Sequence, residues 1–167
     1  AERPWGGISL KKQYYDPQSH AEAYPDYSIN TQYAGRVAEQ WRIKSGRSIY
    51  ASAACWKNSV FVGDVTGLMT AYDKATGKER WHFQADKKIV GSPAVVNGVV
   101  VFGTTGNRIY GLDARTGKQL WHVDTTLPIM GAVATDGKTA YIGGSDHKMH
   151  AIDARTGKER WVFDGVK

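Results

Sequence analysis

The sequence has little cysteine and no long apolar run. One residue of the 167 is cysteine, Cys55, which excludes an intramolecular disulfide and a zinc site built from paired cysteines. No apolar run approaches the roughly 20 residues that span a bilayer, and no charged-then-apolar leader opens the sequence. We therefore expect a chain that is neither membrane-spanning nor an unprocessed precursor, which leaves a mature exported protein open.

The short motifs of several enzyme classes are also missing. The sequence contains neither G-x-S-x-G nor H-E-x-x-H, and residues 137–139 (Gly-Lys-Thr) lack the further glycine of a phosphate-binding loop. Hydrolase and nucleotidase functions therefore have no support in the sequence.

Glycine and aromatic residues are plentiful, with 19 Gly, 6 Trp, 9 Tyr and 4 Phe. This composition favours strands joined by tight turns over an all-helical fold. The apolar share of 41% and the charged share of 23% are typical of one domain that buries a core. The 22 Lys and Arg residues give a net charge of +6 but are dispersed along the chain. Dispersed charge disfavours a nucleic-acid partner, which stays an alternative.

A 40-residue repeat organises the chain. The repeat is marked by Trp41, Trp81, Trp121 and Trp161, which follow one another at intervals of 40 residues with no insertion. The same period is kept by the aspartates Asp73, Asp113 and Asp153 and by the glycines Gly77, Gly117 and Gly157. Three complete units therefore span 42–81, 82–121 and 122–161.

Each unit predicts four short antiparallel strands. In the clearest unit the strands are 92–96, 99–103, 109–113 and 118–123, with an Asn97-Gly98 turn between the first two. Four-stranded units of this length are blades of a β-propeller, because a blade cannot bury both of its faces alone. We predict an all-β partial propeller over residues 41–167, with three blades at about 51–84, 91–124 and 131–164. Residues 1–40 form an irregular Tyr- and Pro-rich extension, and residues 1–43 could supply a degenerate fourth blade.

The repeated residues have structural interpretations. The aspartate of each Asp-x-x-Thr-Gly-Lys segment can accept backbone N–H bonds two or three residues on, and the glycine supplies the positive φ of the turn. Each tryptophan lies on the fourth strand, and its indole is expected to fill the groove between blades against a small residue of the third strand, Ala71, Gly111 or Ala151. These residues are therefore assigned to docking and turn formation rather than to catalysis.

Residues 71–81, 111–121 and 151–161 carry Asp, Thr, Gly, Lys and Trp in the same register. They resemble the tryptophan-docking motif of pyrroloquinoline-quinone-like repeats, and the resemblance covers residues 36–164. That family comprises quinoprotein dehydrogenases and cofactor-free propellers such as the lipoprotein scaffold of the outer-membrane β-barrel assembly machinery. Because most members work outside the cytoplasm, the resemblance implies an extracytoplasmic protein, in the bacterial periplasm.

Two functions follow from the resemblance. The favoured one is a non-catalytic, cofactor-free scaffold or accessory subunit that mediates protein–protein assembly, in a membrane-associated complex. The alternative is a piece of an oxidoreductase that uses pyrroloquinoline quinone with Ca²⁺. The adjacent cysteine pair of quinoprotein alcohol dehydrogenases is absent, since Cys55 stands between Ala54 and Trp56. We predict no catalytic, cofactor-binding or metal-binding residues.

Partner-binding candidates come from two parts of the chain. Propeller loops and blade connections gather on one face, and here they hold a basic set consisting of Arg47, Lys87, Lys88, Arg108, His147 and Lys148. The extension has aromatic residues that could wrap a surface, namely Trp5, Tyr14, Tyr15, Tyr24 and Tyr27. Solvated loops and a flexible leader are the corresponding structural alternatives.

One short cluster has ligand-like chemistry, Asp146, His147 and His150. On a strand the two histidines would point to opposite faces, so we expect no shared metal.

Three blades also form an open arc whose end faces are uncovered. We expect other protein subunits, or a second copy of the chain, to complete the propeller.

Overall fold

The computed structural model describes residues 39–165. The chain divides into two units, Ala1–Gln40 and Trp41–Lys167, and each is considered by itself. Nearly all of the first unit lies outside the described residues, as do residues 1–38 of the predicted degenerate blade. The candidate partner residues of the extension also lie outside them, namely Trp5, Tyr14, Tyr15, Tyr24 and Tyr27.

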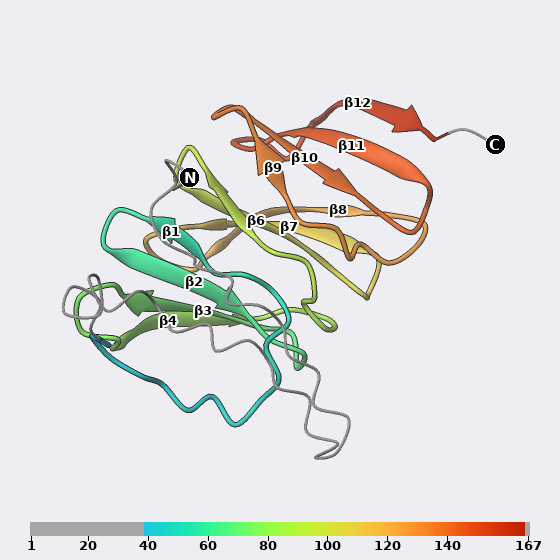
Figure 1. The fold of residues 1–167 in the computed structure, drawn as a ribbon. Coiled ribbons are helices and arrows are strands. Elements are labelled where there is room, and N and C mark those ends of the chain that lie inside the picture. Colours follow the sequence, from blue (N-terminus) through green and yellow to red (C-terminus); the bar gives the residue numbers. More distant parts are fainter. Residues whose placement is uncertain (1–38, 166–167) are drawn as a thin grey trace, which may run out of the picture. The chain divides into compact units, whose positions relative to one another are not determined.

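Three four-stranded antiparallel sheets follow one another along the second unit (Figure 1). The first sheet contains β1 (Ala54–Trp56), β2 (Ser59–Gly63), β3 (Leu68–Asp73) and β4 (Glu79–Gln84). The second contains β5 (Ala94–Val96), β6 (Val99–Thr104), β7 (Arg108–Asp113) and β8 (Gln119–Asp124). The third contains β9 (Ala134–Thr135), β10 (Thr139–Gly143), β11 (Lys148–Asp153) and β12 (Glu159–Asp164). The predicted all-β, three-bladed fold is therefore confirmed. No helix in the described part of the chain is long and apolar enough to cross a membrane.

The strands of the second sheet agree with the prediction to within one or two residues. Asn97 and Gly98 have φ values of 51° and 77° and close the hairpin between β5 and β6. The first strand is shorter than predicted, since Ser92 and Pro93 precede β5. Proline has no N–H with which to pair, so the ladder begins after it.

Apolar side chains from neighbouring sheets form two cores. The first lies between the first and second sheets and includes Phe61 and Met69 with Phe102 and Leu112, all fully buried. The second lies between the second and third sheets and includes the indole of Trp121. Each sheet therefore buries one face against the next, which is the packing of propeller blades.

Backbone hydrogen bonds with the same 40-residue period join the blade connections to the loops. The N–H groups of Val65, Thr105 and Ser145 donate to the carbonyls of Ser48, Lys88 and Pro128, at 3.2, 3.0 and 2.9 Å. These bonds bring together residues 44–50, 64–68, 84–90, 104–108, 124–130 and 144–148, which we call the loop face.

Candidate functional site: docking turns, the loop face and an open sheet face

The Asp-x-x-Thr-Gly-Lys segments are three tight turns with one geometry. In the first, Asp73 Oδ1 accepts the N–H groups of Ala75 and Thr76 at 3.0 and 2.9 Å and the Thr76 hydroxyl at 3.0 Å. Asp113 and Asp153 make the same three bonds in their own turns. Gly77, Gly117 and Gly157 each have φ near +70°, a conformation that favours glycine. The carboxylates therefore serve the backbone of the turns.

Each turn also receives the tryptophan of the preceding repeat. The indole N–H groups of Trp41, Trp81 and Trp121 donate to carbonyls 33 residues further on, which belong to Lys74, Ala114 and Ala154. These bonds measure 2.9, 3.2 and 2.9 Å. The indoles lie against the turn glycines, where a Cβ on Gly157 would approach Trp121 Cγ to 2.6 Å. The glycine is therefore needed twice, once for its φ and once for the space it leaves.

Only half of this contact was predicted from the sequence. Trp81 and Trp121 do pair across their sheets with Ala71 and Gly111. The contact with the next blade's turn was not foreseen, although the matching periods of tryptophan and glycine are the signal that could have shown it.

Changing Gly157 to alanine should destabilise the protein by more than the same change at Gly137. Both glycines have positive φ, +73° and +91°, where an L-residue costs about 1–2 kcal/mol. At Gly137 nothing lies within 4 Å of an added Cβ, whereas at Gly157 it meets Trp121. Thermal unfolding of both variants measures the difference. Equal losses would show that the indole does not rest on the turn.

Arginine strengthens two of the three turns. Arg80 donates to Asp73 Oδ2, and Arg160 donates to Asp153 Oδ2 at 2.7 Å. With the Thr76 bonds, Arg80 lowers the pKa of Asp73 from 3.8 to about 2, and Arg160 with Thr156 does the same for Asp153. The second turn has Leu120 at this position. The pKa of Asp113 is raised by burial, but the bonds from Thr116 and Arg115 outweigh that effect and leave it lowered.

These lowered pKa values predict a loss of stability in acid. The unfolded chain takes up protons at Asp73 and Asp153 near pH 3.8, while the folded chain resists until about pH 2. Their stabilising contribution is therefore complete above about pH 4 and disappears as the pH falls to 2. Urea unfolding across this range should show a weaker acid dependence for Asp73→Asn than for Asp113→Asn. Equal slopes would show that Arg80 does not hold the Asp73 carboxylate.

The loop face contains all six basic residues predicted as partner contacts. Two of them are neutralised, since Arg47 lies 3.5 Å from Asp64 and Arg108 lies 2.7 Å from Asp124. Arg108 holds the pKa of Asp124 below its usual value. Lys87 and Lys88 form no ion pair within residues 39–165.

The remaining two basic residues lie in the turn before β11 and at the start of that strand. His147 is exposed with a φ of 63°, and its carbonyl accepts the Gly165 N–H at 2.7 Å. Lys148 is half-buried at the start of β11. Sequence reasoning missed the acidic partners of the arginines and two exposed apolar residues on the same face, Leu127 and Met130.

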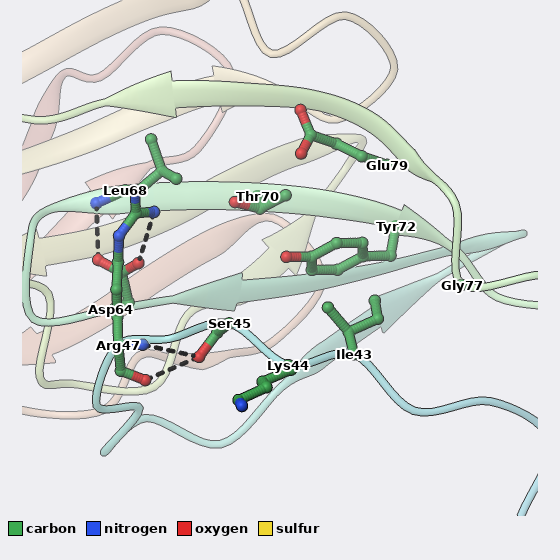
Figure 2. Close-up of a pocket in the computed structure, with 10 residues that line it drawn as sticks. All are labelled: Ile43, Lys44, Ser45, Arg47, Asp64, Leu68, Thr70, Tyr72, Gly77 and Glu79. Carbon is green, nitrogen blue, oxygen red and sulfur yellow. Dashed lines mark hydrogen bonds and ion pairs between the residues drawn. The ribbon is translucent and has the colours of Figure 1, made fainter.

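A groove of about 350 Å³ lies between the segment 43–47 and the first sheet (Figure 2). In Figure 2, Thr70 and Tyr72 of β3 line one side of the groove, and Ile43 and Lys44 line the other. The Ser45 hydroxyl donates a hydrogen bond to the Arg47 carbonyl and accepts one from the Arg47 N–H. These two bonds hold the segment in a turn. Arg47 is paired with Asp64, and Glu79 is paired with His82 elsewhere in the first sheet. We assign no ligand to this groove.

In the third sheet two carboxylates flank a buried histidine. His150 Nδ1 lies 2.7 Å from Glu159 Oε1, and Nε2 lies 3.0 Å from Asp146 Oδ2. The side chains of His150 and Asp146 are 6% and 1% exposed. The imidazole therefore lies between two carboxylates, one at each ring nitrogen.

This cluster differs from the predicted one. His147 does not lie on the strand with His150, because β11 begins at Lys148 and His147 occupies the turn before it. The prediction that both histidines lie on one strand was therefore wrong. No group of three His, Cys, Asp or Glu side chains within residues 39–165 is placed to hold a metal ion. Glu159 was missed, although its repeat equivalent Glu79 bonds a histidine in the first sheet, His82, at 2.7 Å.

The last sheet leaves an apolar face without a partner in residues 39–165. Met149, Trp161, Val162 and Phe163 line a hollow there, which we call the open face. Trp161 is 49% exposed, whereas Trp121 at the same repeat position is 9% exposed. The Trp161 indole N–H has no acceptor among the described residues.

These sheets, their periodic turns and their tryptophan contacts define a β-propeller built from docking repeats. The family model described as "Outer membrane protein assembly factor BamB" matches residues 34–162. The chain therefore belongs to this family of pyrroloquinoline-quinone-like repeat proteins. No curated protein matches the chain.

Solved structures show the same fold. BamB from Moraxella catarrhalis is 25% identical with a TM-score of 0.67, and the match covers 74% of this chain and 39% of that one. Quinohemoprotein alcohol dehydrogenase from Comamonas testosteroni is 23% identical with a TM-score of 0.60, covering 70% and 27%. The computationally designed Ika4 protein is 22% identical with a TM-score of 0.66, covering 74% and 76%. The chain thus spans about two fifths of the Moraxella BamB it matches.

Proposed function

We propose that this chain is a non-catalytic, cofactor-free scaffold that assembles with other proteins outside the cytoplasm and contacts them through the loop face. The observation that supports this most is the match of residues 34–162 to the family described as an outer-membrane protein assembly factor. Assembly at an outer membrane would place the protein in a bacterial periplasm as part of a membrane-associated complex.

The chemistry of the loop face supports a protein partner. Lys87 and Lys88 are not neutralised within the described residues, and Leu127 and Met130 are 45% and 52% exposed. Cations beside exposed apolar side chains suit a partner surface that combines acidic and apolar groups. The periodic backbone bonds hold these residues on fixed loops, so little ordering entropy is lost on binding.

Site-specific photo-crosslinking tests this function. A benzoylphenylalanine at Met130 of the exported chain in a Gram-negative host should capture discrete proteins, whereas one at Lys78 on a docking turn should not. Adding Lys87→Glu and Lys88→Glu should reduce the Met130 products several-fold at low salt, because charge pairs across an interface are screened by ions. Lys74→Glu with Lys118→Glu is the matched charge control.

Two results would contradict the scaffold function. One is a pattern of crosslinks that is the same from Met130 and from Lys78. The other is dye-linked alcohol oxidation by the purified chain after addition of pyrroloquinoline quinone and Ca²⁺, which would favour an oxidoreductase instead.

A further inference from the structure

The end of each sheet that lies away from the loop face carries two turns side by side. One is the hairpin turn between the first two strands, and the other is the docking turn between the last two. The N–H groups of Lys74, Ala114 and Ala154 in the docking turns donate to carbonyls of the hairpin turns at 2.9, 2.8 and 3.2 Å. We call this surface the turn face, and it consists of residues 57–58, 73–78, 97–98, 113–118, 136–138 and 153–158.

Exposed cations are concentrated on the turn face, with two or three from each blade. They are Lys57, Lys74, Lys78, Arg115, Lys118, Lys138, Arg155 and Lys158. None of the eight forms an ion pair with another described residue. The basic residues that are dispersed along the sequence are therefore gathered in space, because the 40-residue period returns them to the same end of every sheet.

The aspartates of the turn face do not offset these cations. Asp73, Asp113 and Asp153 each direct Oδ1 to N–H groups of their own turns. Asp136 Oδ1 likewise accepts the N–H groups of Lys138 and Thr139, at 2.9 and 2.8 Å. Eight cations against four aspartates leave a net charge of +4 on this surface.

The other side chains of the turn face are small. Apart from the cations and the aspartates it has only Asn, Thr, Ala and Gly. Protein interfaces are centred on aromatic and apolar anchors, and single-stranded nucleic acid binds to aromatic platforms. Elements that read duplex DNA project into a groove, which these short turns do not. Cations without apolar anchors instead suit a layer of phosphate head groups, to which each Lys or Arg contributes separately.

We propose that the turn face binds the phosphate head groups of an anionic lipid bilayer. The choice of a bilayer rests on the proposed function, which places the chain in a membrane-associated complex. The turn face and the loop face lie at opposite ends of the strands. The chain can therefore rest on a membrane through one face while it holds a protein partner on the other.

Cosedimentation of the purified chain with vesicles tests the inference. Vesicles of about one third phosphatidylglycerol and two thirds phosphatidylcholine should bind the chain at low salt, and vesicles of phosphatidylcholine alone should not. Lys78→Gln, Lys118→Gln and Lys158→Gln together remove one cation from each blade and should weaken binding about ten-fold or more.

The matched control is Lys44→Gln, Lys87→Gln and Lys88→Gln, which lowers the net charge equally but on the loop face. This variant should weaken vesicle binding by less than about three-fold. All six lysines are exposed and form no ion pair with described residues, so circular dichroism should show both triple variants folded.

Three results would overturn the inference. One is equal binding to the two kinds of vesicle, and another is an equal loss of binding in the two triple variants. The third is removal of the chain from anionic vesicles by a DNA duplex at equal phosphate concentration, which would make nucleic acid the occupant. Because the vesicles contain no protein, failure here leaves the Met130 crosslinks unaffected, and failure of those crosslinks leaves vesicle binding unaffected.

Discussion

Replacing Trp121 by alanine is expected to lower the free energy of unfolding by about 3–5 kcal/mol. The indole is 9% exposed in the core between the second and third sheets, and its N–H donates to the Ala154 carbonyl at 2.9 Å. Its loss leaves a void and an unpaired carbonyl together. Because a domain has about 5–15 kcal/mol in total, the melting temperature should fall by on the order of 10 °C.

The matched control is Trp161→Ala, which removes the same side chain from the same repeat position. Trp161 is 49% exposed and makes no hydrogen bond with its indole in the described chain, so the loss should stay below about 1 kcal/mol. Differential scanning calorimetry of the two variants gives the comparison. Melting temperatures that fall equally would contradict the docking arrangement.

Replacing His150 by alanine should cost about 3–5 kcal/mol, because it leaves the buried Asp146 carboxylate without its histidine partner. Asp146 has a side chain 1% exposed, and Glu159 would lose its 2.7 Å contact. His122→Ala is the matched control, since that imidazole is 40% exposed and contacts Gln119 and Asp124 at the surface. Urea unfolding at neutral pH measures both.

A rescue variant makes the His150 prediction specific to charge burial. The equivalent residues of the second blade are Gly106, Tyr110 and Gln119, none of them a carboxylate. Asp146→Gly, His150→Tyr and Glu159→Gln together should therefore be more stable than His150→Ala alone. A triple variant less stable than His150→Ala would show that packing, rather than unpaired charge, explains the loss.

The fold could be predicted from the sequence because the repeat is strict. Four tryptophans at one spacing and an Asn-Gly turn locate the blades without long-range information. The strand ends were less certain, and Pro93 shows why, since the missing N–H shortens β5 without changing the pattern of apolar residues.

The candidate site was predictable only in part, because its geometry joins residues of different repeats. Composition suggested a basic loop face, but the cross-strand pairing of Arg108 with Asp124 neutralises part of it. The contact of Trp121 with the Gly157 turn crosses from one blade to the next and cannot be read from either repeat alone. Glu159 likewise lies on the strand beside His150.

Exchange of the four repeat-position indole N–H groups with deuterated water, followed by NMR, tests the central claim most directly. The claim is that each tryptophan docks on the turn of the next blade and that Trp161 alone lacks such a turn within residues 39–165. The account predicts slow exchange for Trp81 and slowest exchange for Trp121, which is buried, and fast exchange for Trp161. Exchange of Trp121 as fast as that of Trp161 would contradict it.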